Sequence, residues 1–100
     1  MGKIYVGQTA LIFRDSTGID LSNADTMEIK YIKPDNTDGS WDAEIYGAAI
    51  DGVIQYTIES ADDLDQAGEW VRWAYITFTN GNIAPGEPIG FVVEEEGDFF

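Results

Sequence analysis

Residues 68–81 read Gly-Glu-Trp-Val-Arg-Trp-Ala-Tyr-Ile-Thr-Phe-Thr-Asn-Gly. The stretch holds two of the three tryptophans, and most of its residues are β-branched or aromatic. Such residues suit a pleated, half-buried surface. The final Asn-Gly pair supplies the positive φ angles of a tight turn. We therefore predict a long central strand of an all-β protein that ends at this turn.

The two faces of this strand are similar in polarity. One face carries Trp70, Arg72, Ala74, Ile76 and Phe78, and the other carries Val71, Trp73, Tyr75 and Thr77. Because neither face is clearly polar, alternation alone leaves open which one points inward. The pattern also suggests that the second face is covered by something.

Length and composition describe one folded unit. A chain of 100 residues is long enough for a single core and too short for two. The apolar content of 44% is that of a globular chain, and no apolar run approaches the roughly 18 residues that cross a bilayer. We predict a single domain over residues 1–95 and an acidic, aromatic C-terminal tail over 96–100.

The net charge of the chain disfavours some classes of binding partner. Nineteen acidic residues against five basic ones give a net charge of −14. Nucleic acid is disfavoured because phosphate binding needs clustered Lys and Arg, and anionic membrane surfaces are disfavoured for the same reason. Two explanations of the acidity stay open, namely solubility and docking onto a basic partner surface.

Turn signals divide the rest of the chain into short strands. Besides the central strand, we expect strands over 3–6, 9–14, 25–33, 41–46, 53–58 and 89–93. Ser60 and Asp63 loosely fit a capping box, which predicts one short helical turn near residues 60–65. About seven short strands at regular spacing are typical of an immunoglobulin-like Greek-key β-sandwich.

Period-two alternation also predicts a core. Inward positions on the other strands are Met27, Ile29, Tyr31, Trp41, Ala43, Ile45, Ile54, Tyr56 and Ile58. Ile19 and Leu21 are expected to close one end of this core from a loop.

The sequence offers no catalytic constellation. It contains no His and no Cys, the commonest general base and the strongest nucleophile, and carboxylate pairs carry no signal among 19 acids. The loop from Asp35 begins like a calcium loop but has Tyr46 where the bidentate glutamate belongs. Asp62, Asp63 and Asp65 form another oxygen-rich group, which we interpret as solvated turn acids. We predict a non-enzyme without metal or cofactor, and a calcium-stabilised adhesion domain is a weaker hypothesis.

Aromatic residues make up 13% of the chain and are the better guide to function. If Trp70 faces inward, Trp73 and Tyr75 face outward on the same strand. Exposed pairs of this kind suit protein interfaces, and they also suit stacking on sugars. The predicted partner-binding residues are Val71, Trp73, Tyr75, Tyr46, Phe99 and Phe100.

Several segments follow one another in a familiar order. They are Val6-Gly7-Gln8-Thr9, Asp15 to Leu21, Lys33-Pro34-Asp35, Asp51 to Thr57, Asp63 to Trp70, Thr79-Asn80-Gly81 and Pro88 to Val93. This order resembles the immunoglobulin-like domain at the N-terminus of phage baseplate upper proteins, and related small domains of phage and prophage structural proteins.

The resemblance implies a virion structural protein of the tail, baseplate or head surface. Such a protein is assembled in the host cytoplasm, located in the virion, and bound to other virion subunits in many copies on a symmetric particle. The match favours Trp70, Ala74, Ile76 and Phe78 as the inward set, so that Arg72 must reach an edge or pair with an acid. The alternative is a carbohydrate-binding or host-surface adhesion module that contacts a host glycan.

Overall fold

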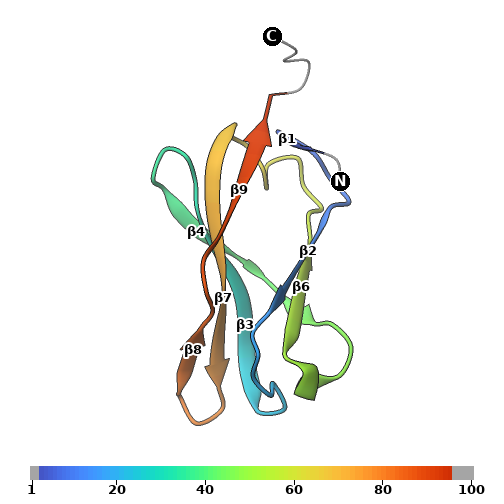
Figure 1. Ribbon diagram of the computed structural model, residues 1–100, viewed down its shortest axis with the longest axis vertical. Helices are drawn as coiled ribbons and strands as arrows, with labels where there is room; N and C mark the ends of the chain where they lie inside the picture. Colours follow the sequence, from blue (N-terminus) through green and yellow to red (C-terminus); the bar gives the residue numbers. More distant parts are fainter. Residues whose placement is uncertain (1–2, 96–100) are drawn as a thin grey trace.

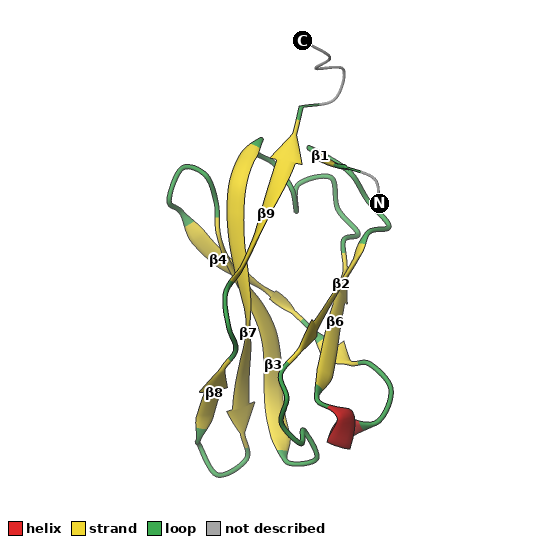
Figure 2. Ribbon diagram, viewed as in Figure 1, coloured by secondary structure: helices red, strands yellow, loops and turns green. Residues whose placement is uncertain are grey.

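The computed structural model describes residues 3–95, which form a β-sandwich with one 3-10 helix (Figures 1 and 2). The strands are β1 (Ile4–Tyr5), β2 (Ile12–Ser16), β3 (Ala24–Ile32), β4 (Asp38–Asp42), β5 (Glu44–Ile45), β6 (Val53–Thr57), β7 (Gly68–Phe78), β8 (Ile83–Pro85) and β9 (Ile89–Glu94), and the 3-10 helix is η1 (Ala49–Asp51). Within this part of the chain, no helix is long and apolar enough to span a bilayer.

Two sheets face each other. The larger has the order β1-β9-β7-β3-β4, with β8 also paired to β7, and the smaller has the order β2-β6-β5. All pairs are antiparallel except β1 with β9. The predicted central strand is β7, which pairs with β3 and, along its other side, with β8 and β9 in succession. The predicted all-β sandwich is confirmed.

The predicted strand over 41–46 is in fact two strands in different sheets. β4 pairs with β3 in the larger sheet, whereas β5 pairs with β6 in the smaller one. Ala43 lies between them, and its N–H donates to the carbonyl of Met27 at 2.9 Å. Strands at the corner of a sandwich can change sheet through such a bend, and alternation of side chains continues across it.

The segment near residues 60–65 is a hydrogen-bonded turn and not a helix. The Asp63 carboxylate accepts the N–H groups of Glu59 and Ser60 at 3.3 Å, and the Asp63 N–H donates to the Ser60 carbonyl at 3.0 Å. The capping residues therefore close one turn as expected. The 3-10 helix lies elsewhere, at η1, where no helical turn was predicted.

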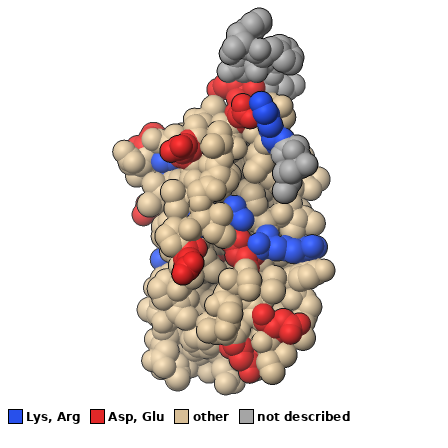
Figure 3. Space-filling model, viewed as in Figure 1, with Lys and Arg blue, Asp and Glu red and all other residues tan. Residues whose placement is uncertain are grey.

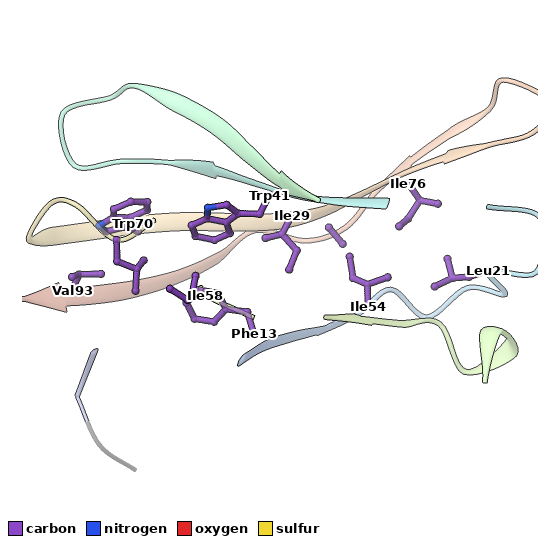
Figure 4. Packing of buried hydrophobic residues seen from close by; sticks show 11 residues of the cluster. Phe13, Leu21, Ile29, Trp41, Ile54, Ile58, Trp70, Ile76 and Val93 are labelled. Carbon is purple, nitrogen blue, oxygen red and sulfur yellow. The ribbon is translucent and has the colours of Figure 1, made fainter. Parts of the chain in front are cut away.

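The core lies between the two sheets (Figure 4). The predicted inward face of β7 is confirmed, since Trp70, Ala74 and Ile76 are buried. Trp41 on β4 is stacked on Tyr56 at a centroid distance of 5.3 Å and an interplanar angle of 4°. Leu21 is buried too, as predicted for a residue that closes one end of the core. Burial of such rings contributes most of the apolar area of a small core.

Arg72 points inward and forms an ion pair with Asp15, which is one of the two outcomes expected for an arginine on this face. Its Nη2 lies 2.9 Å from Oδ1 of Asp15 on β2, and its Nε also donates to both carboxylate oxygens. The side chains of Arg72 and Asp15 are only 12% and 3% exposed. The guanidinium lies 4.4 Å from the ring centroid of Phe13. This ion pair therefore joins the two sheets inside a largely apolar environment.

Candidate interaction surface

The outward face of β7 forms the middle of an apolar strip on the larger sheet. Val71 is paired in register with Ile32 of β3, and Thr77 with Ile83 of β8. Because residues opposite each other share a face, these side chains and their neighbours lie together. We call this surface the outer-face strip, and it consists of Ile32, Val71, Trp73, Tyr75, Ile83 and Val92.

The strip is only partly open to solvent. Ile83, Val92 and Ile32 are 54%, 53% and 37% exposed, whereas Trp73 and Tyr75 are half-buried. Lys30 accounts for part of that cover, because its Nζ lies 3.7 Å from the centroid of the Tyr75 ring. The sequence suggested that this face is covered, yet no strand or helix within residues 3–95 lies over it.

Acidic residues border the strip. On the β4 side, Asp38 and Asp42 are paired with Ile32 and Glu28, which places three carboxylates on this face. On the β9 side, Glu69 is paired with Val92. Lys30 is the single cation that the strand registers place among them in the described chain. The surface is thus an apolar centre with a mainly acidic rim.

The structure separates the six predicted partner-binding residues. Val71, Trp73 and Tyr75 lie together on the outer-face strip. Tyr46 follows β5 in the other sheet, where its ring lies 3.9 Å from the Arg14 guanidinium carbon. Phe99 and Phe100 fall outside the described residues. The predicted set therefore does not form one surface.

Sequence reasoning missed Ile83, Ile32 and Val92. Ile83 lies in a segment that was expected to be a loop, although its position just after Asn80-Gly81 is that of the return strand of a hairpin. Ile32 and Val92 occupy outward positions of strands whose other outward residues are polar or small. Exposed apolar residues at outward positions are the signal that would have found them.

No metal-binding cluster of three or more acidic, His or Cys side chains occurs within residues 3–95. The acids of the predicted oxygen-rich loops are instead used locally. Asp35 accepts from Thr37 and Gln66, and these hydrogen bonds lower the pKa of its carboxyl. Asp65 accepts from Lys33 at 3.0 Å and raises the pKa of that lysine.

Comparison with protein-family models and with curated proteins gives no match. Among solved structures, the fold is similar to that of CopC from Methylosinus trichosporium OB3b. The two share 13% sequence identity and a TM-score of 0.58, over 100% of this chain and 91% of that chain. At this identity the likeness supports the β-sandwich fold alone.

Proposed function

We propose that this chain is a non-enzymatic structural protein that binds other subunits of a virion through its outer-face strip. The observation that carries the proposal is the apolar centre around Trp73 and Tyr75. Aromatic residues at the middle of such a surface contribute most of the binding energy of protein interfaces. The ordered segments that resemble phage structural domains supply the virion context.

The partner surface that fits best is apolar at its centre and basic at its rim. The acidic border of the strip and the net charge of −14 both favour Lys and Arg on the partner. Charges at an interface rim act mainly on association rate and specificity. We therefore expect association with the partner to slow as ionic strength rises.

A double variant tests this role directly. We expect Trp73→Ser with Tyr75→Ser to abolish incorporation into particles while the melting transition of the free chain stays cooperative. Ile50→Ser is the control, because Ile50 is 70% exposed on η1 and lies outside the outer-face strip and its acidic border. Immunogold labelling of particles reads out incorporation. Unchanged labelling of the double variant would contradict the proposed interface, and unlabelled wild-type particles would contradict the virion role.

The glycan-binding alternative needs accessible ring faces for stacking. Lys30 lies over the ring of Tyr75, which leaves that ring less open to a sugar. We therefore favour a protein partner. A glycan array probed with the whole chain distinguishes the two, since protein docking predicts no binding to the array.

A further inference from the structure

The backbone of β2 has one unpaired edge. β2 pairs only with β6, and no other strand within residues 3–95 lies beside it. The Thr17 N–H donates to the Gly52 carbonyl, and the Ile58 N–H donates to the Leu11 carbonyl. Because hydrogen-bonded pairs alternate along an antiparallel ladder, the N–H and C=O groups of residues 13 and 15 also point to β6. Those of residues 12, 14 and 16 point to the free side.

Two adjoining hollows run along this free edge. One, of about 590 Å³, lies between β2 and β1 and is lined by Ile4, Leu11 and Phe13 among others. The second, of about 450 Å³, continues past Asp15 and Ser16 to the loop before β9. Each is within the range of sites that hold ligand groups. We call the two together the β2 groove; it lies on the side of the molecule where Figure 1 shows β2 apart from β9.

Cationic residues gather at this groove. Lys3, Arg14 and Arg72 line the larger hollow, and they are three of the five basic residues of the chain. Most of the basic side chains visible in Figure 3 lie on this same side. Arg72 is neutralised by Asp15 and Lys3 lies 3.5 Å from Glu94. Arg14, the middle residue of the unpaired edge, has no carboxylate within ion-pair distance in the described chain. Its Nε donates to Oε1 of Gln55 at 3.1 Å and its guanidinium lies over the Tyr46 ring, so its positive charge is hydrogen-bonded but not neutralised.

We propose that the β2 groove binds an extended segment of a partner protein, which adds to the smaller sheet as a new strand beside β2. Main-chain hydrogen bonds to residues 12, 14 and 16 hold the segment, as in other strand-addition complexes. Its inward side chains are apolar and contact Phe13 and Leu11. Its outward side chains include a carboxylate beside Arg14, because opposite charges across neighbouring strands stabilise the pairing.

A second copy of this chain is a poor occupant of the same edge. Antiparallel pairing of two β2 strands about their centre would place Arg14 of one copy opposite Arg14 of the other. Like charges directly opposite destabilise a strand pair, and charged edge residues are a common protection against self-pairing. An acidic segment from a different protein has no such conflict. This site is independent of the outer-face strip, since the two lie on different sheets.

The test first selects peptides that bind the chain and then identifies where on the chain they bind. A library of random ten-residue peptides is screened against the whole chain, and we expect enrichment of Asp or Glu alternating with β-branched or aromatic residues. In the free protein, the amide hydrogens of Ile12, Arg14 and Ser16 should exchange rapidly. A selected peptide should slow their exchange at least tenfold and leave Phe13 and Asp15, already bonded to β6, unchanged.

Two matched controls separate strand addition from simple charge attraction. Arg14→Glu should weaken an acidic peptide at least tenfold, whereas Arg14→Lys should retain most of the binding. Two versions of one peptide, N-methylated at alternate positions of opposite parity, should differ at least tenfold, because only one parity donates to β2. The proposal is overturned if no acidic peptide is enriched, if protection falls outside β2, if its three amides are already protected in the free chain, or if both methylated peptides bind equally.

Discussion

Tyr56 carries a pH dependence that can be read from its surroundings. Burial, followed by its hydrogen bond to Asp63 at 2.8 Å, raises the pKa of Tyr56 to about 12 from an ordinary value of 10. A raised pKa in the folded state stabilises the protein fully below the unfolded value. That contribution is lost as the pH rises from 10 to about 12.

We predict that Tyr56→Phe lowers the free energy of unfolding by about 1 kcal/mol at pH 8, the usual net value of one hydrogen bond. The difference from wild type should shrink between pH 10 and about 12, because Tyr56 ionises there in the unfolded chain while it stays largely protonated in the folded protein. Urea unfolding at several pH values measures both effects. Tyr46→Phe is the control, since Tyr46 is 44% exposed. A difference that grows above pH 10 would refute the assignment.

A second prediction concerns how much the buried Arg72–Asp15 ion pair contributes to stability. Asp15→Leu leaves the guanidinium buried without its partner, and breaking a buried pair in this way costs about 3–5 kcal/mol. Adding Arg72→Met removes the orphaned charge and should restore much of that stability. Urea denaturation of the single and double variants gives the comparison. A double variant no more stable than the single one would mean that packing, and not charge, sets the cost.

For the individual strands, alternation and turn signals predicted which side chains face the core better than they predicted where each strand begins and ends. The inward residues of β3, β6 and β7 follow from a period of two, because each strand has one face in the core. The split between β4 and β5 did not follow, since alternation continues through Ala43 while the chain changes sheet. β8 was missed because residues 82–88 were expected to form a loop, and a strand of three residues is too short to show alternation. Pairing partners of this kind depend on tertiary contacts that local pattern does not contain.

Only part of the outer-face strip could be predicted from the sequence. Val71, Trp73 and Tyr75 share a face because they alternate along one strand, so their grouping follows from sequence. Their neighbours from β3, β8 and β9 follow only from strand order and register. The free edge of β2 was invisible for the same reason, because an unpaired edge is a property of the whole sheet.

The segment just before β2 contains a residue with a left-handed backbone, which gives a testable prediction. A strand was expected from residue 9, yet Ala10 has φ of 62° and β2 begins at Ile12. The Ala10 N–H and the Leu11 carbonyl both bond to Ile58, which is the two-against-one pattern of a β-bulge. Left-handed backbone costs a residue with a Cβ roughly 1–2 kcal/mol, so Ala10→Gly should stabilise the fold by about 1 kcal/mol. Ala61→Gly, at an exposed turn position without positive φ, should be neutral or destabilising in the same thermal melts.

At the scale of the whole molecule, charge is arranged unevenly. The outer-face strip has an acidic rim, whereas the β2 groove has three of the five basic residues along it, of which Arg14 has no carboxylate within ion-pair distance in residues 3–95. The two surfaces therefore favour partners of opposite charge. A domain with one contact on each sheet can join two different neighbours, which suits a subunit of a larger assembly.

The net charge of −14 has its own consequence for the folded state. Repulsion among like charges destabilises a compact chain, and salt screens it over a Debye length that falls from about 30 Å at 0.01 M to about 3 Å at 1 M. The buried Arg72–Asp15 pair is screened much less than surface charges. We therefore predict that the melting temperature rises by several degrees between about 0.01 M and 0.5 M sodium chloride.

Neutralising exposed acids supplies the matched control for this salt effect. Asp25, Asp51 and Asp62 are exposed and belong neither to the outer-face strip or the acids named at its border, nor to the lining of the β2 groove. Changing all three to Asn removes three negative charges and brings the net charge from −14 to −11. This change should raise the melting temperature at low salt and reduce the dependence of the melting temperature on salt. A melting temperature that falls as salt is added would mean that attractive surface pairs outweigh the repulsion. Lys33–Asp65 would then be the first such pair to remove, since Lys33 is only 18% exposed there.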